Sequence, residues 1–413
     1  METKKKELLL LVTVTLLALC VSDVLIGLYF WRNDVIKKHY YHWRFAQAAA
    51  RTGEEKGFDM RSRAEILSDL RREGQVIYPA ISAADFRTDE IQIFDKGKRI
   101  QPLSGISNSK SLLSIETRKW IVYESDRYGF NNPPQLGISD TEFAFVGDSF
   151  VHGMSVDTQD TVAGWFNRKG FNARSFGLTS NGPLRELATI REFVAPLRPK
   201  TVFWMYYSGN DFTDLYRELR QPILPDYLKP GFSQSLRSIQ SVIDVELKRF
   251  VEKRFQVALE NPPFSANAIW NSFTDQLLPA LKLRQWRELL RRSRKTSEEL
   301  QALRRAASPE LRDVFTRILE MAKREVADFG GKFYFVYLPT WAELAEKEPS
   351  ANRKFVLETA AKLDISSIDL LPKIEALADP LSMFPYRLPA HYTAEGYGRV
   401  ADWLIAEIKE HAN

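Results

Sequence analysis

The segment Phe143–Gly153, FAFVGDSFVHG, combines a strand-like apolar run with reactive polar residues directly after it. Its first residues, FAFV, are all apolar, which is typical of a strand that is buried on both faces of a parallel sheet. The run ends on Gly-Asp-Ser at 147–149, and a second glycine follows at position 153. Gly-Asp-Ser also occurs in ordinary turns. The motif alone therefore leaves two interpretations open, a turn or a strand end that presents Ser149 as a nucleophile.

Strand-like and helix-like segments alternate through the rest of the chain after about residue 140. This alternation predicts an α/β fold with a parallel sheet that is covered by helices on both faces. The predicted strands are Phe143–Val146, Ala173–Phe176, Thr201–Tyr207, Lys332–Tyr337 and, with a weaker pattern, Ile365–Asp369. The predicted helices cover about Ala163–Lys169, Pro183–Phe193, 309–328, 352–362 and 394–411, with Thr393 as the N-cap of the last one.

Residues 213 to about 305 interrupt this alternation with amphipathic helical stretches and aromatic-rich pieces such as PPFSANAIWNSF at 262–273. One interpretation is a helical elaboration that buries its own apolar face. The other is a lid over the site that faces substrate or membrane. The pattern does not favour either.

The N-terminal segment Leu8–Trp31 is a run of 24 residues interrupted by one charge, Asp23. As a helix it would be about 36 Å long, enough to cross a hydrocarbon layer of about 30 Å with some tilt. We therefore expect residues 1–31 to form a retained, single-pass membrane anchor. Lipid attachment at Cys20 is the weaker interpretation, because Leu19 stands where a small residue is expected.

The bulk composition is that of a globular protein, with 413 residues, 44% hydrophobic and 27% charged. The net charge of +5 is modest, and its basic residues are spread through helix-like stretches, so nucleic-acid binding is not expected. A single cysteine excludes an internal disulfide and a cysteine-ligated zinc site. No cofactor or metal is expected. We divide the chain into the anchor, a stalk and strand-rich lead-in at 32–139, and a main domain at 140–413.

Three reactive residues follow predicted strands: Ser149 after the first, Asn210 after the third and His391 after the fifth. Ligands gather at the carboxyl ends of parallel strands, so we expect these three side chains at one rim. A serine nucleophile needs a general base, and His391 is the best placed of the five histidines. The others are His39 and His42 in the stalk, His411 in the tail, and His152, which lies on the same turn as Ser149 and is expected to be structural.

Asn210 is suited to stabilising a negatively charged oxygen, because its amide donates hydrogen bonds without carrying charge. The backbone N–H of Ser149 and one from the loop GLTSNGP at 177–183 would complete such an oxyanion hole. Asp148 is expected to serve the turn or the oxyanion loop and not to act as a catalytic acid.

At these residues the chain resembles the SGNH (GDSL-type) hydrolase superfamily, over about Asp140–Ile408. The matching segments are GDSFVHG at 147–153, SGND at 208–211 and HYTAEGY at 391–397, and SDRYGFNNPP at 125–134 is similar to the segment before the first block in membrane-anchored bacterial members. The resemblance implies a flavodoxin-like three-layer sandwich, in which Ser149 is the nucleophile, His391 the base and Asn210 an oxyanion donor. The second-block glycine corresponds to Ser180, whose backbone N–H would be the other donor.

Such members act on acyl esters of envelope polysaccharides or lipids outside the cytoplasm. The resemblance therefore implies an esterase in the inner membrane with its main domain on the periplasmic side. The charges that flank the anchor nearly cancel and leave its orientation open. Two alternatives remain, an O-acyltransferase with the same machinery and a non-catalytic, membrane-tethered module for glycan binding or assembly.

The chain departs from the family in the residues before the histidine. The family usually places an aspartate three, sometimes two, residues before it, and this chain has Leu388 and Pro389 there. We therefore expect a Ser–His dyad in which a backbone carbonyl orients His391, or an acid supplied from elsewhere, such as Asp369 or the 213–305 segment. A dyad would make a slow enzyme.

Overall fold

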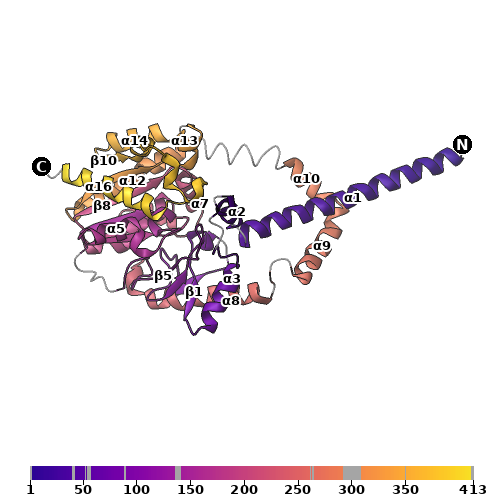
Figure 1. Ribbon diagram of the computed structural model, residues 1–413, viewed down its shortest axis with the longest axis horizontal. Helices are drawn as coiled ribbons and strands as arrows, with labels where there is room; N and C mark the ends of the chain where they lie inside the picture. The colour runs from indigo at the N-terminus through magenta and orange to yellow at the C-terminus, as the bar shows by residue number, and fades with distance from the viewer. Residues whose placement is uncertain are drawn as a thin grey trace. The chain divides into compact units, whose positions relative to one another are not determined.

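The structure is a computed structural model that describes residues 2–39, 42–51, 57–87, 90–134, 141–260, 265–291, 308–348 and 350–410, together with residues 53 and 262. It is a mixed α/β protein with a central parallel sheet and an N-terminal apolar helix (Figure 1). The chain forms two compact units, Met1–Trp43 with Arg254–Ala302, and Arg44–Lys253 with Leu303–Asn413. These boundaries differ from the expected ones at 31, 139 and 213–305.

The first unit is built on α1 (Glu2–His39), against which α9 (Ala266–Ala280) and α10 (Arg284–Arg291) pack. Its segment Lys4–Val35 is long and apolar enough to cross a membrane, as the anchor prediction requires. The Cys20 thiol is free.

The second unit contains five parallel strands in the order β10-β9-β8-β6-β7. Their bounds are β6 (Phe143–Gly147), β7 (Ala173–Gly177), β8 (Thr201–Tyr207), β9 (Lys332–Leu338) and β10 (Ser366–Asp369). All five strand predictions are confirmed, with ends that differ by no more than one residue. The sequence made this possible for β6, β8 and β9 because each is a short and mostly apolar run, whereas β7 and β10 carry polar residues and gave weaker signals.

Helices cover both faces of this sheet. Alternate side chains of a strand point to opposite sides, so each strand contributes to a buried cluster on each face. Ala144 and Val146 of β6 face one hydrophobic cluster with α6, α12 and α14, whereas Phe143 and Phe145 face a second one with α5, α15 and α16. The helices and short turns of this part of the chain are α4 (Ser149–His152), η3 (Thr158–Asp160), α5 (Val162–Arg168), α6 (Pro183–Thr189), η4 (Ile190–Val194), η5 (Ala195–Leu197), α12 (Pro309–Asp328), α13 (Trp341–Ala345), α14 (Arg353–Lys362), α15 (Leu370–Glu375), η9 (Pro380–Met383), η10 (Pro385–Arg387) and α16 (Ala394–Glu410). The predicted cap of the last helix is present, since Thr393 Oγ1 accepts from the Gly396 N–H at 3.0 Å.

The lead-in packs on the sheet unit and is not a separate stalk beyond Arg44. Its apolar residues, among them Ile81, Phe86 and Ile106, belong to the same buried cluster as Ala144 and Val146. Its elements are α2 (Trp43–Arg51), α3 (Arg63–Arg72), β1 (Ile77–Pro79), η1 (Ala83–Arg87), β2 (Ile93–Asp95), β3 (Lys98–Ile100), β4 (Lys110–Leu112) and β5 (Val122–Glu124). They form a small sheet, β1-β4-β5, and a hairpin, β2-β3.

The segment expected as an insertion divides between the two units. Its first part contains α7 (Asp211–Glu218), η6 (Leu224–Leu228), η7 (Leu236–Ser238) and α8 (Gln240–Glu260). Ile243, Leu247 and Phe250 of α8 are buried in the core cluster, so this part is a helical elaboration of the sheet unit. The part from Arg254 onward, which includes the end of α8, belongs with α1. Residues 292–307 lie outside the described residues.

Candidate active site

Ser149 is the first residue of α4, immediately after β6, and is 7% exposed. Two glycines allow this short helix to lie close to the sheet. A Cβ on Gly147 would be 2.6 Å from Val151 Cγ2, and one on Gly177 of β7 would be 2.3 Å from the backbone nitrogen of His152. The strand-to-helix turn at Ser149 therefore requires glycine on both neighbouring strands.

His391 lies directly against Ser149, with 2.7 Å between its Nε2 and the serine Oγ. The imidazole also packs against the ring of Phe150, at 4.8 Å between ring centroids. The two side chains are 242 residues apart in the sequence and meet because both follow carboxyl ends of parallel strands. In this geometry Nε2 can accept the hydroxyl proton of Ser149.

Glu116 completes a chain of three side chains. Both of its carboxylate oxygens lie 3.0 Å from His391 Nδ1, and one also accepts from the His391 backbone N–H at 3.0 Å. Ser155 Oγ donates to the same carboxylate. The expected orienting group, a backbone carbonyl, is therefore replaced by a buried carboxylate, and Asp369 is not the acid, because it caps α15 and pairs with Arg353.

The charges of Glu116 and His391 support each other. Burial alone would raise the pKa of Glu116, but the charge of His391 and the hydrogen bonds from His391 and Ser155 outweigh it and lower the pKa to about 2. Burial alone would lower the pKa of His391, but the charge and hydrogen bond of Glu116 hold that pKa above its usual value. The pair therefore stabilises an imidazolium at His391 and fixes Nδ1 as the protonated nitrogen of the neutral ring.

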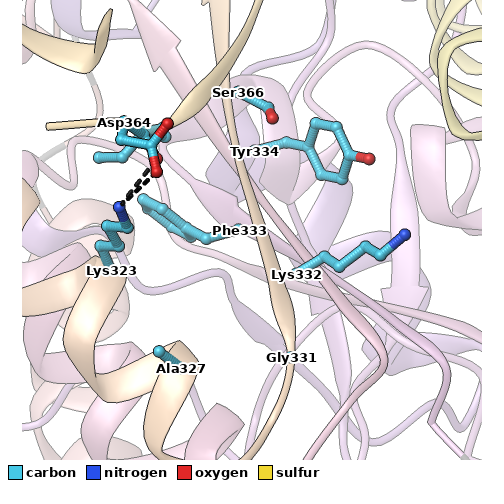
Figure 2. A pocket seen from close by; sticks show the side chains of 9 residues that line it. Lys323, Ala327, Gly331, Lys332, Phe333, Tyr334, Asp364 and Ser366 are labelled. Atoms are coloured by element: carbon cyan, nitrogen blue, oxygen red, sulfur yellow. Dashed lines mark hydrogen bonds and ion pairs between the residues drawn. The ribbon is translucent and has the colours of Figure 1, made fainter. Parts of the chain in front are cut away.

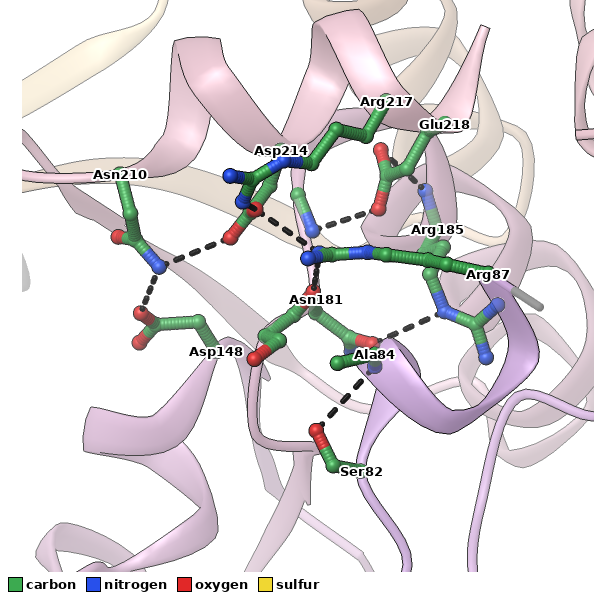
Figure 3. A network of polar contacts seen from close by, with 12 residues as sticks. Ser82, Ala84, Arg87, Asp148, Asn181, Arg185, Asn210, Asp214, Arg217 and Glu218 are labelled. Carbon is green, nitrogen blue, oxygen red and sulfur yellow. Dashed lines mark hydrogen bonds and ion pairs between the residues drawn. The ribbon is translucent and has the colours of Figure 1, made fainter. Parts of the chain in front are cut away.

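Asn210 is the N-cap of α7 and lies between two carboxylates (Figure 3). Its Nδ2 donates to Asp148 Oδ2 at 3.2 Å and to Asp214 Oδ2 at 2.9 Å. Asp148 is fully buried, caps α4 through the Phe150 N–H at 2.9 Å, and lies 3.3 Å from Ser149 Oγ. Burial raises the pKa of Asp148 to about 6. The amide of Asn210 is thus one carboxylate away from the serine hydroxyl, and Asp148 has the turn-forming contacts that the sequence suggested.

Arg87 connects Asn210 to the loop after β7. One guanidinium nitrogen, Nη2, donates to Asp214 Oδ1 at 2.8 Å and to the backbone carbonyl of Ser180 at 2.9 Å. Figure 3 shows Arg87 next to Asp214, whose other oxygen accepts from Asn210. Arg217 also pairs with Asp214, at 3.0 Å, from the more exposed side. A single side chain of the lead-in therefore contacts two of the three segments from which oxyanion donors were expected, the loop after β7 and α7.

Ser180 adopts the left-handed conformation, with φ 65°. Glycine takes this conformation freely, whereas a serine there costs about 1 kcal/mol. The loop is also held by His152, whose Nδ1 accepts from the Thr179 N–H at 3.1 Å. Burial lowers the pKa of His152 to about 3, so the ring stays neutral. His152 is therefore a structural residue of this loop, as expected.

The segment SDRYGFNNPP supports α4 and β7 from behind. Asn131 Nδ2 donates to the carbonyl of His152 at 2.8 Å. Asn132 Nδ2 donates to the carbonyl of Ser175 at 2.8 Å and to Asp126 Oδ2 at 2.9 Å. Asn131 thus fixes the end of α4, and Asn132 fixes β7 beside it.

Sequence reasoning missed Glu116 and Arg87. Both lie in the strand-rich lead-in, which was expected to precede the main domain and not to contribute to its site, and Glu116 is 275 residues from His391. One signal was available, since Glu116 is a lone acid directly after the segment SLLSI at 111–115, which contains three large apolar residues. A buried acid needs a partner, but the sequence does not identify it.

A separate pocket lies at the amino ends of the sheet strands, opposite the carboxyl ends that Ser149 follows (Figure 2). It is lined by residues at the amino ends of β9 and β10 and by α12, among them Lys323, Gly331 and Asp364. Lys323 Nζ donates to the carbonyls of Leu363 and Asp364, at 2.7 and 2.8 Å, so the cation serves the connection before β10. The pocket is remote from Ser149, which follows a carboxyl end.

Among the described residues, no group of three or more histidine, cysteine or acidic side chains is arranged to hold a metal ion. No protein-family model matches the chain, and no curated protein matches it.

Proposed function

We propose that the protein is a serine-dependent ester hydrolase with Ser149 as nucleophile, His391 as general base and Glu116 as the acid that orients and stabilises His391. The observation that carries the proposal is the contact of 2.7 Å between Ser149 Oγ and His391 Nε2, with Glu116 on the other ring nitrogen. Nucleophile, base and orienting acid in this arrangement are the parts that acyl transfer through serine needs.

In the proposed reaction, Ser149 Oγ attacks the acyl carbonyl of the ester while His391 Nε2 takes the hydroxyl proton. Collapse of the tetrahedral intermediate breaks the bond to the alcohol, which leaves with the proton from His391. Water then attacks the acyl-enzyme with the same base, which releases the carboxylic acid and restores Ser149. Glu116 stays ionised throughout and stabilises the imidazolium that forms twice in the cycle.

The oxyanion donors are the Asn210 amide and the backbone N–H groups of Ser149 and Ser180. For Asn210 to donate, one N–H turns from Asp148 to the substrate oxygen, and the contact with Asp214 holds the amide in place. Since Ser180 contributes its backbone, serine can replace the glycine of the family at this position.

We assign the chain to the SGNH (GDSL-type) hydrolase superfamily, with a flavodoxin-like three-layer sandwich. Numbered in chain order, the five parallel strands have the sequence 2-1-3-4-5 across the sheet, which is the flavodoxin-like order. The helices on both faces and the position of Ser149 at a carboxyl end support the assignment.

We further propose that the substrate is an acyl ester of an envelope polysaccharide or lipid and that the sheet unit lies on the periplasmic side of the inner membrane. The apolar segment Lys4–Val35 supports membrane attachment. Reporter fusions on either side of this segment test the orientation, and a cytoplasmic C-terminal part would contradict it.

The non-catalytic alternative depended on the lack of an acid near His391, and the contact with Glu116 removes that argument. Hydrolysis and acyl transfer differ in whether water or a sugar hydroxyl attacks the acyl-enzyme. The assay below therefore includes both acceptors.

The test is fluorophosphonate labelling of the full chain in its membrane, followed by acyl release from acetylated glycans and short-chain esters with and without a sugar acceptor. We expect labelling and turnover in the wild type and neither in Ser149→Ala, while Ser238→Ala, a change in an exposed serine of η7 away from the site, keeps both. Labelling of the folded wild type no stronger than that of Ser149→Ala would overturn the proposal.

A further inference from the structure

The side-chain pattern of α9 is the reverse of that of a helix on a soluble protein. Its buried side carries Ser272, which is 6% exposed, and Gln276, whose side chain lies against Gly27 of α1. Its outward side carries large apolar residues: Trp270 is 63%, Leu278 76% and Leu281, just after the helix, 73% exposed. Helices that pack together in lipid place small and polar residues between them and apolar residues on their outer sides.

The partner of α9 and α10 is the part of α1 that carries its polar residues. Trp286 of α10 donates from its backbone N–H to Asp23 Oδ1 at 2.8 Å and from its indole Nε1 to Ser22 Oγ at 2.9 Å. Asp23 is fully buried by these contacts. An acidic residue within a membrane segment needs such a polar partner, so α10 accounts for the one charge that interrupts the apolar run.

These contacts lie within the hydrocarbon layer for every crossing that stays inside the apolar run Leu8–Trp31. A crossing of about 30 Å needs about 20 residues. Any 20 consecutive residues within Leu8–Trp31 include Ser22, Asp23 and Gly27. If α1 spans a membrane, the segments that touch these three residues enter the bilayer with it.

We propose that α9 and the start of α10 are a membrane-embedded element that lies in the lipid beside α1. The element is independent of the proposed catalytic function. With 15 residues, α9 is about 22 Å long, too short to cross the layer. Asn271 and Asp275 are exposed next to its apolar side, so α9 lies partly embedded, with this edge toward the headgroups. Lys282 and Arg284 are exposed at the turn into α10, where they can bind anionic lipid.

The experiment places a fluorescent label at single cysteines of the full chain in phospholipid vesicles. Cys20 is the only cysteine, so Cys20→Ser provides the background. Leu278→Cys and Leu281→Cys report on α9. Val21→Cys, 53% exposed in the apolar segment of α1, is the control for lipid exposure, and Lys354→Cys, on an exposed side chain of α14, is the control for water.

We expect nitroxide-labelled acyl chains to quench the labels at 278 and 281 as strongly as the label at 21, and aqueous iodide to quench only the label at 354. Iodide quenching at 278 and 281 equal to that at 354 would overturn the proposal. Protection from both quenchers would also overturn it, because the apolar side of α9 would then be covered by protein, such as a second copy of the chain. All four labelled positions are exposed, so the substitutions that introduce the labels remove no buried contact.

Discussion

Replacing Glu116 with glutamine removes the negative charge beside His391 and keeps the size of the side chain. Glu116 is fully buried, and its oxygens lie 3.0 Å from the imidazole Nδ1. Two unit charges at this distance attract each other by about 5 kcal/mol at an effective dielectric constant of about 20. This stabilisation matters only when His391 carries a proton, as it does in the transition state.

A loss of about 5 kcal/mol corresponds to a factor of about 10⁴ in rate. The glutamine oxygen can still accept one hydrogen bond, so we expect Glu116→Gln to lower kcat/KM by about 10³ to 10⁴. Loss of the equivalent acid in serine proteases costs about 10⁴. The fluorophosphonate labelling rate should fall by a similar factor, because labelling also needs the deprotonated serine.

The assay is ester hydrolysis by the full chain, with Glu124→Gln as the matched control. Glu124 is an exposed acid on β5 in the same lead-in, and its loss should leave kcat/KM unchanged. Circular dichroism and Tm should establish that both variants are folded. A folded Glu116→Gln variant with kcat/KM within about tenfold of the wild type would refute the role of Glu116, because the carboxylate would then not stabilise the imidazolium.

Four further outcomes are expected. The raised pKa of His391 should place the acidic limb of the kcat/KM–pH profile above about pH 6.5, because His391 must be neutral to act as a base. Glu116→Gln should move that limb to lower pH. An unmoved limb would contradict the pairing of Glu116 with His391. Arg87→Met should lower kcat by about 10- to 100-fold with a smaller change in KM, because the Arg87 side chain holds both Asp214 and Ser180. The control is Arg217→Met, which loses only a partly exposed contact with Asp214 and should lower kcat/KM by about twofold or less in steady-state kinetics. Ser180→Gly should keep activity within about threefold, because the donor is a backbone N–H; a loss of about 100-fold would mean that the hydroxyl is needed. Gly177→Ala should lower the free energy of unfolding by about 1–3 kcal/mol in denaturant titrations, because the new Cβ would lie 2.3 Å from the backbone nitrogen of His152. An unchanged denaturation midpoint would show that α4 can move away from β7.

The elements of the sheet could be predicted because their signals are local. The apolar runs at Phe143–Gly147 and Thr201–Tyr207 are short, continuous and followed by glycine or polar residues, and their ends were predicted within one residue. The same holds for Thr393, because a cap needs only a side chain next to the helix start. The positions of Ser149, Asn210 and His391 after such strands were enough to predict that they approach one another.

The lead-in was assigned less well, because its strands have only three residues each and contribute to a core that is built mainly from distant segments. Nothing near Arg87 indicates that it reaches a carbonyl 93 residues away. The division of 213–305 between the two units was also not predictable, since amphipathic periodicity shows that a helix has an apolar side but not what covers it.

The amino-acid sequence by itself determined the order of strands and helices and the apolar N-terminal segment. It also singled out Ser149 and His391 as candidate site residues. Each of these depends on neighbouring residues or on a short motif. Only the tertiary structure decided that Glu116 is the acid on His391 and that Arg87 joins Asp214 to the Ser180 loop. Both contacts join segments that are far apart in the chain, and a buried charge finds its partner through the folding of the whole domain, not through spacing along the sequence.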